Sequence, residues 1–112
     1  MLPPIHLVFT ACGTRDDAER LGRRLVEEKL AACASVLPGA VSFYTWKEES
    51  RRDEECLVLL KTTGPALAAL EARLIELHAY ECPEFVAVPA ERVAEAYAAW
   101  VAESVEPPVQ PA

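Results

Sequence analysis

The chain has 112 residues, 52% of them hydrophobic, with 18 acidic and 11 basic residues and a formal net charge of -7 at pH 7. This length and hydrophobic content fit one compact domain with its own core and exclude a chain that is disordered throughout. The negative charge excludes the concentrated basic surface that a nucleic-acid-binding protein presents to phosphates.

The chain contains four cysteines, but no two of them form a C-x-x-C pair. Zinc-ribbon and thioredoxin-like sites therefore lose their main support. Residues 1–10 lack the basic stretch and the long apolar run of a secretory signal, and no apolar run approaches the roughly 20 residues of a membrane helix. We therefore expect a cytoplasmic protein with reduced thiols that does not enter a membrane.

The first half of the chain predicts a strand, a helix and a long strand. Residues 5–12 are apolar and β-branched, which is typical of a buried strand. Thr14 can cap the helix that follows, with Asp17 three residues later as in a capping box. Residues 33–47 are rich in β-forming residues, and Pro-Gly at 38–39 predicts a bend or bulge. In the helix that Thr14 caps, the apolar face toward the core is formed by Ala18, Leu21, Leu25 and Val26.

The second half predicts two strands and two helices. The charged residues 47–55 predict an exposed hairpin tip, and residues 56–63 predict a buried strand. Gly-Pro at 64–65 opens a helix, because proline suits the first turn. Residues 84–88 predict a fourth strand, and residues 90–105 predict a third amphipathic helix. The expected core faces are Leu67, Leu70, Leu74 and Leu77 in the second helix, and Val93, Tyr97, Trp100 and Val101 in the third.

The order of these elements predicts an α+β fold of the ferredoxin-like, split βαβ type with an added C-terminal helix. Right-handed crossovers place both main helices on one face of an antiparallel sheet and leave the other face bare. An apolar bare face predicts self-association. We expect a single domain over residues 1–104 and a frayed, proline-rich tail over residues 105–112.

The segment LHAYECPE at residues 77–84 gathers imidazole, thiol and carboxylate groups, which are the side chains that hold transition metals. The local sequence favours a simpler interpretation, in which His78 ends a helix and interacts with its dipole. Only two or three of these side chains can converge within one turn. A complete metal site would therefore need ligands from another strand or another subunit.

Two further residues stand out, and each has two interpretations. Cys33 is either a buried thiol or a soft metal ligand or redox-sensitive group. Lys61, at the end of an apolar strand, either pairs with a carboxylate such as Glu84 or binds an anion. The carboxylates of residues 47–55 favour a solvated turn over an acid–base pair. The sequence contains no recognisable set of nucleophile, base and orienting group and no glycine-rich phosphate loop, so we expect no enzymatic activity.

Four blocks of the sequence resemble one known family. They are EEKLAACASVLPG at 27–39, SFYTW at 42–46, LVLLKTT at 57–63 and LHAYECPE at 77–84. Their matching positions follow the pattern E-x-L-A-A-C, P-G, S-x-Y-x-W, L-x-x-K-T-T and H-x-Y-x-x-P-E. Over residues 5 to about 104 the chain therefore resembles the CutA divalent-cation tolerance proteins.

The resemblance implies a PII-like homotrimer whose sheets extend between subunits and whose inter-subunit clefts are the ligand sites. It also implies a role in tolerance of divalent metals, copper especially, with no organic cofactor and no established reaction. The alternative is a PII-like signalling or scaffold module that takes a small anionic ligand or a protein partner at these clefts. The metal-ligand candidates are His78 and Cys33, and the cleft candidates are Lys61, Tyr44, Trp46, Tyr80 and Glu84.

The chain departs from the family pattern at three positions. Thr10 stands where some members discussed as copper binders carry a cysteine, and Leu77 stands where they carry a second histidine. Cys12, two residues beyond Thr10 and on the same strand face, could take the place of that cysteine only if the turn allows it. Glu48 replaces the glycine that usually follows the tryptophan by two residues, so we expect a different hairpin turn.

Overall fold

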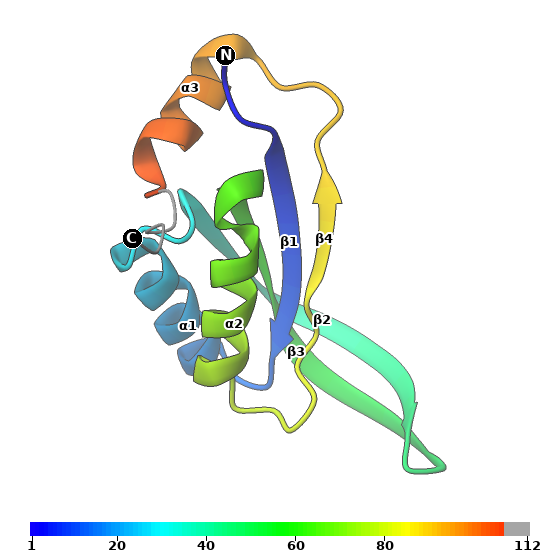
Figure 1. Cartoon of the computed structure of the whole chain (residues 1–112). Helices are drawn as coiled ribbons and strands as arrows, with labels where there is room; N and C mark the ends of the chain where they lie inside the picture. The colour runs from blue at the N-terminus through cyan, green and yellow to red at the C-terminus, as the bar shows by residue number, and fades with distance from the viewer. Residues whose placement is uncertain (107–112) are drawn as a thin grey trace.

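The structure is a computed structural model and describes residues 1–106 (Figure 1). The strand order is β2-β3-β1-β4, every neighbouring pair is antiparallel, and α1 and α2 lie together on one face of the sheet. The predicted ferredoxin-like α+β fold is therefore confirmed. In chain order the elements are β1 (Ile5–Cys12), α1 (Arg15–Glu27), β2 (Cys33–Trp46), β3 (Glu49–Thr63), the 3₁₀ helix η1 (Gly64–Ala66), α2 (Leu67–Leu77), β4 (Val86–Pro89) and α3 (Glu95–Ser104).

Helix α1 begins as its sequence predicts. The Thr14 side-chain oxygen accepts a hydrogen bond from the backbone N–H of Asp17 at 3.1 Å, which satisfies one free donor of the first turn. The guanidinium of Arg20 donates a hydrogen bond to the carboxylate of Asp17, with 3.4 Å between Nη1 and Oδ1. Further along α1, a Cβ added to Gly22 would lie 3.0 Å from the Cβ of Ala34, so the glycine lets α1 pack closely on β2.

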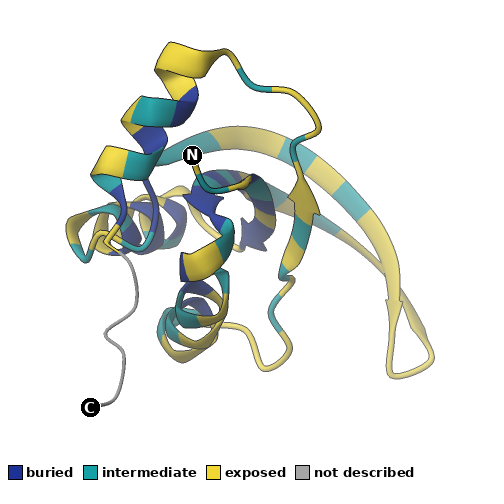
Figure 2. Cartoon of the chain, turned by 45° about the horizontal axis from the view of Figure 1, so that its top comes forward, coloured by how far each residue is buried: buried dark blue, intermediate teal, exposed yellow. Residues whose placement is uncertain are grey.

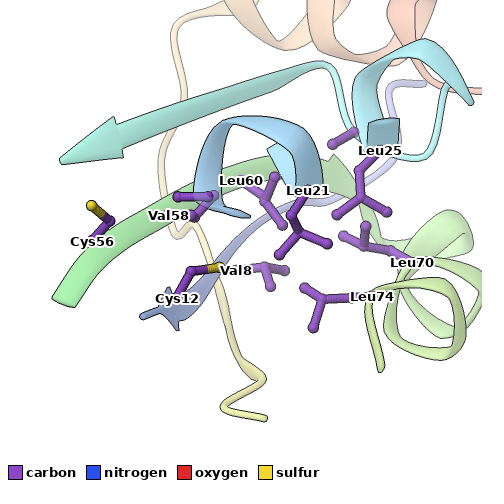
Figure 3. Packing of buried hydrophobic residues seen from close by; sticks show 11 residues of the cluster. Val8, Cys12, Leu21, Leu25, Cys56, Val58, Leu60, Leu70 and Leu74 are labelled. Carbon is purple, nitrogen blue, oxygen red and sulfur yellow. The ribbon is translucent and has the colours of Figure 1, made fainter. Parts of the chain in front are cut away.

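The main core lies between the two helices and the sheet. Figure 3 shows leucines of α1 and α2 pointing toward apolar side chains of β1 and β3. The predicted core faces of both helices are confirmed at Leu21, Leu25, Leu70 and Leu74, with Leu67, Leu77 and Val26 partly buried around them. Figure 2 shows the same distribution, with buried residues concentrated where the helices meet the sheet.

A second, smaller core lies under α3. Val105 belongs to it, and the backbone N–H of Glu106 donates to the carbonyl of Lys29 at 3.0 Å. Val105, the first residue of the tail that was expected to be frayed, is therefore packed, and residues 107–112 lie outside the described part. This core contains Ile5, Ala32, Ala66, Ala98, Val101 and Val105.

The long hairpin differs from its prediction. The bulge at Pro-Gly is confirmed, because the pairing of β2 with β3 shifts between Leu37 and Ala40 and Gly39 has a φ of 88°. Residues 47–55, however, are not a loose tip. Only Lys47 and Glu48 form the turn, and β3 starts at Glu49, seven residues earlier than expected. The physical reason is that both faces of this two-stranded segment contact water, so its strands need no alternation of apolar and polar residues. Residues 49–55 therefore lack the pattern by which a strand is recognised in a sequence.

Helix α3 also differs from its prediction. It begins at Glu95 and not at residue 90, because the chain before it is held by the sheet: the N–H of Ala90 donates to the Ile5 carbonyl at 2.9 Å. Val101 is buried as expected, but Tyr97 and Trp100 are exposed. None of the helices within residues 1–106 has the length and hydropathy to span a membrane.

The sheet face opposite α1 and α2 is bare and apolar, as predicted. Directly opposed residues of an antiparallel pair share a face, so the observed register places these side chains side by side. We call this set the bare sheet face. Its exposed members are Phe9, Leu37, Leu57, Val86 and Val88.

Candidate functional site

The candidate residues fall into two regions of the structure. One region comprises the segment that follows α2 and the long β2–β3 hairpin, whose two-stranded part, residues 40–55, we call the hairpin arm (Figure 1). The other region is the far end of the sheet, next to α3. The first contains His78, Tyr44, Trp46, Tyr80 and Glu84, and the second contains Cys33 and Lys61.

His78 ends α2, and both of its ring nitrogens are engaged. Nε2 lies 2.9 Å from the carbonyl oxygen of Ala11, and Nδ1 accepts the backbone N–H of Tyr80 at 3.1 Å. A carbonyl can only accept, so Nε2 carries the proton and Nδ1 does not. The imidazole therefore holds the turn after α2 against the end of β1, and neither nitrogen is free for a metal.

The two metal-ligand candidates are not brought together within one protomer. His78 contacts Cys12, which pairs with Cys56 of β3, whereas Cys33 pairs with Lys61. On β3, Lys61 is five positions beyond Cys56, a distance of about 16 Å along the strand. Among residues 1–106, no group of three His, Cys, Asp or Glu side chains is placed to hold a metal ion. His78 and Cys33 of one protomer therefore cannot both contact the same ion.

Four cleft candidates do come together. A cavity of about 520 Å³ opens between the hairpin arm and the segment that follows α2. We call it the arm cavity. Its wall is acidic and aromatic, and none of its lining residues is basic. The lining residues are Ala11, Ser42, Phe43, Tyr44, Trp46, Asp53, Glu55, Tyr80, Glu81, Cys82 and Glu84.

Two tyrosines of the arm cavity are bound to carboxylates of β3. The Tyr80 hydroxyl donates to Glu55 at 2.8 Å, and the Tyr44 hydroxyl donates to Asp53. Burial, and then the hydrogen bond to Glu55, raises the pKa of Tyr80. The hydrogen bond to Asp53 raises the pKa of Tyr44. Both phenols therefore remain protonated donors at neutral pH and leave the negative charge of the wall on the carboxylates.

Lys61 lies outside the arm cavity, and its partner is Tyr97 and not the Glu84 that the sequence suggested. Its Nζ donates to the hydroxyl of Tyr97 at 3.0 Å and lies 5.3 Å from the centre of that ring. The hydrogen bond to Tyr97 raises the pKa of Lys61, so it stays charged. Within the described chain it does not pair with Glu84, which lines the arm cavity. Cys33, opposite Lys61, lies 3.8 Å from the Ser35 hydroxyl.

Sequence reasoning missed the two carboxylates of the arm cavity that bind its tyrosines. Asp53 and Glu55 belong to the run of charges that predicted a solvated turn, yet they face Tyr44 and Tyr80. The alternation of this segment would have shown that positions 53 and 55 share a face, but not which face. That depends on the pairing with β2, which is a long-range property of the hairpin.

The geometry thus defines a ferredoxin-like α+β domain with an acidic cavity alongside a projecting hairpin arm. Comparison with known families agrees with this fold and identifies the family. The family model described as "CutA1 divalent ion tolerance protein" matches residues 6–104. The chain belongs to this family.

Individual relatives agree with this assignment. The chain is 38% identical to the divalent-cation tolerance protein CutA of Thermus thermophilus, over 88% of this chain and 96% of that protein. It is 32% identical to the human protein CutA over 91% of this chain, but it spans only 57% of that protein. Among solved structures, CutA1 from Oryza sativa superimposes with a TM-score of 0.90 at 30% identity, covering 94% of this chain and 96% of that one.

Proposed function

We propose that this protein acts in divalent-cation tolerance as a cytoplasmic homotrimer that binds cations weakly in clefts at its subunit boundaries. Membership of the family supports the role in cation tolerance. The family carries the name of a tolerance protein and not of an enzyme. Copper is the metal that the sequence resemblance suggests, and it remains a prediction.

The arm cavity is the observation that carries this proposal. Four carboxylates, Asp53, Glu55, Glu81 and Glu84, line it without a basic residue among its walls. Carboxylate and phenol oxygens are ligands for divalent cations, harder ions more than soft ones. Because residues 1–106 of one protomer contain no group of three such ligands around one point, the shell would be completed by water or by a neighbouring subunit.

The bare sheet face supports the trimer. It presents a contiguous apolar surface that a second copy of the chain would cover. In addition, β2 and β4 are the two edges of the sheet, and unpaired edges invite pairing with another chain. The strand register places Ser42, Asp53 and Glu55 of the arm cavity on the same side of the sheet as this face, so assembly would bring a neighbour close to the cavity.

The cytoplasmic location rests on the sequence alone. Relatives are named as chloroplastic in Arabidopsis thaliana and as periplasmic in Archaeoglobus fulgidus, so proteins of this family occur in several compartments. Fractionation of the native cells with an antibody to this chain is the direct measurement.

The alternative, a PII-like module for an anionic ligand, has less support from the described residues. An anion would meet the carboxylates of the arm cavity, and Lys61 is engaged with Tyr97 at the other end of the sheet. An anion site would therefore have to be built around Lys61 by an adjoining subunit. A thermal shift with anionic metabolites that is lost in Lys61→Ala would favour this alternative.

Isothermal titration with Cu²⁺ and Mn²⁺ tests the cation proposal. The double variant Asp53→Asn/Glu84→Gln should weaken binding about tenfold or more, because each change removes a charge from the cavity wall. The double variant Glu27→Gln/Glu71→Gln, at exposed positions of α1 and α2, removes the same total charge and should bind like the unmodified chain. His78→Ala should also keep its affinity, because its nitrogens are already engaged.

Two results would contradict the proposal. The first is the absence of binding heat with either cation at millimolar concentration in a chain shown to be folded. The second is full affinity in the carboxylate double variant together with lost affinity in His78→Ala, which would place the cation at the end of α2.

A further inference from the structure

Two of the four cysteines are direct cross-strand neighbours. Cys12 of β1 pairs with Cys56 of β3, and this is the last pair of the ladder between the two strands. Both side chains belong to the main core, with only 3% and 6% of their surface exposed. Both are free thiols in the structure. The other two cysteines, Cys33 and Cys82, have no such partner among the described residues.

The backbone geometry suits a bond between these two sulfurs. Directly opposed residues of an antiparallel pair have Cα atoms about 4.5–5.5 Å apart. Disulfides span Cα distances of about 4.4–6.8 Å. Figure 3 shows the side chains of Cys12 and Cys56 on adjacent strands, with their sulfurs turned in different directions. Closing the bond therefore requires rotation of the side chains and not a movement of the strands.

Of the two thiols, Cys12 is the one that lines a described cavity. Cys12 lines a cavity of about 130 Å³ between the first turns of α1 and the end of α2, together with Gly13, Asp17, Arg20 and His78. A water-sized molecule occupies about 30 Å³, so a molecule as small as hydrogen peroxide fits beside the Cys12 sulfur. Cys56 does not line this cavity.

We propose that Cys12 and Cys56 form a redox pair, in which a small peroxide oxidises Cys12 and Cys56 then closes a disulfide between β1 and β3. The Cys12 sulfur attacks one peroxide oxygen, the O–O bond breaks, and the second oxygen leaves as water with the thiol proton. This gives a sulfenic acid. The Cys56 sulfur attacks that sulfur, and the hydroxyl leaves as water with the second thiol proton. In total, two thiols and one peroxide yield one disulfide and two waters.

The surroundings of Cys12 make this reaction slow at neutral pH. Burial raises the pKa of the Cys12 thiol to about 11, and the nearby Asp17, Cys56 and Glu55 act in the same direction. Because the thiolate is the reactive form, we expect the oxidation of Cys12 to need sustained exposure to peroxide.

The position of the pair gives the disulfide a structural consequence. Cys56 is the point at which β3 leaves β1 and continues into the hairpin arm. The bond would tie the base of the arm to the end of β1, next to the start of α1. It would also close the loop of residues 12–56 covalently, which reduces the freedom of the unfolded chain. The oxidised form should therefore unfold at a higher temperature than the reduced form.

The experiment uses the full chain with Cys33→Ser and Cys82→Ser, which leaves only the proposed pair. The folded protein is treated with hydrogen peroxide, alkylated and weighed by mass spectrometry. We expect both thiols to disappear together, the mass to fall by two hydrogens, and digestion to yield a cross-linked peptide joining positions 12 and 56. Reductant should restore the mass, and the oxidised form should show the higher midpoint of thermal unfolding.

Single variants separate the roles of the two sulfurs. In this background Cys56→Ala should leave Cys12 as a sulfenic acid that a selective reagent traps, whereas Cys12→Ala should leave Cys56 as a free thiol. Circular dichroism of each variant confirms that it is folded. The unmodified chain provides the reference dose, because its exposed Cys82 reports that the peroxide has acted.

Three results would overturn the proposal. The two thiols could remain free at the dose that oxidises Cys82. Cys12 could advance to sulfinic acid while Cys56 stays free. Finally, the cross-link could form only in the presence of urea, which would show that the folded strands do not allow it.

Discussion

Two threonines buried in the same sheet differ in their hydrogen bonding. Thr62 is fully buried, and its hydroxyl donates to the Leu30 carbonyl at 2.7 Å. Thr10 has 1% of its surface exposed, and its hydroxyl finds no partner among residues 1–106. A buried hydroxyl without a partner loses its bonds to water and gains none in return.

We predict that Thr10→Val stabilises the protein by about 1 kcal/mol, because the isosteric change removes the unpaired hydroxyl and keeps the volume. Thr62→Val is the matched control and should destabilise by about 1–2 kcal/mol, because it leaves the Leu30 carbonyl unpaired. Urea unfolding at one fixed protein concentration measures both. A lower urea midpoint for Thr10→Val would show that its hydroxyl is satisfied in solution.

The turn of the hairpin arm contains two residues with unfavourable backbone angles. Lys47 and Glu48 have φ values of 51° and 68°, the left-handed pair required by a two-residue type I′ turn. Side chains with a Cβ adopt this region at a cost, and glycine does not. Glu48, which stands where the family pattern has a glycine, therefore occupies a strained position of this turn.

We predict that Glu48→Gly stabilises the protein by about 1 kcal/mol, because it removes that strain. Glu48→Ala, which removes the same charge but keeps the Cβ, should give little or no gain. Thermal unfolding of the two variants, measured side by side, separates backbone strain from charge. Equal midpoints for glycine and alanine would mean that the backbone conformation at position 48 carries no cost.

At the scale of elements, an ion pair joins the two main helices. Arg73 of α2 donates from Nε and from one terminal nitrogen to the two carboxylate oxygens of Glu28, at 2.9 and 3.0 Å, where Glu28 ends α1. The side chains are 25% and 29% exposed, so solvent screens the pair in part. The hydrogen bonds that Arg73 donates lower the pKa of the Glu28 carboxylate. The two helices are thus held together at one end by a geometry suited to a charged carboxylate.

The lowered pKa of Glu28 sets the pH dependence of this contribution. The ion pair stabilises the fold above the ordinary glutamate pKa of 4.5 and is lost as the pH falls through the lower value of the folded state. Glu28→Gln should therefore lower the urea midpoint at pH 7, and its difference from the unmodified chain should shrink below pH 4.5. Glu71→Gln on the exposed face of α2 is the control. A difference that does not depend on pH would assign the loss to packing.

At the scale of the whole molecule, the bare sheet face predicts that folding and assembly are coupled. If a trimer covers this face, the unfolding midpoint should rise with protein concentration. Leu57→Glu puts a charge at its centre and should yield a species that sediments as a monomer with a lower unfolding temperature. Trp46→Glu tests in the same way whether the hairpin arm belongs to the interface, and it should also yield a monomer if that side chain faces a neighbouring subunit. An unchanged sedimentation profile for Leu57→Glu would remove this face from the interface.

Much of the fold could be predicted from local patterns. β1 begins and ends where its sequence predicts, and the leucines of α2 point into the core at their helical spacing. The charged half of β3 and the late start of α3 could not be predicted in this way. The first depends on pairing with β2 across a two-residue turn, and the second depends on the bond from Ala90 to Ile5.

By itself, the sequence determined the order of strands and helices, the apolar face of each helix and the resemblance to one family. These properties depend on residue types at fixed short spacings, which side-chain periodicity and turn chemistry make readable. The tertiary structure alone decided that His78 is fully engaged, that Asp53 and Glu55 face two tyrosines, and that Cys12 lies opposite Cys56. Strand register decides these contacts. It brings together residues far apart in the chain, and no local pattern encodes it.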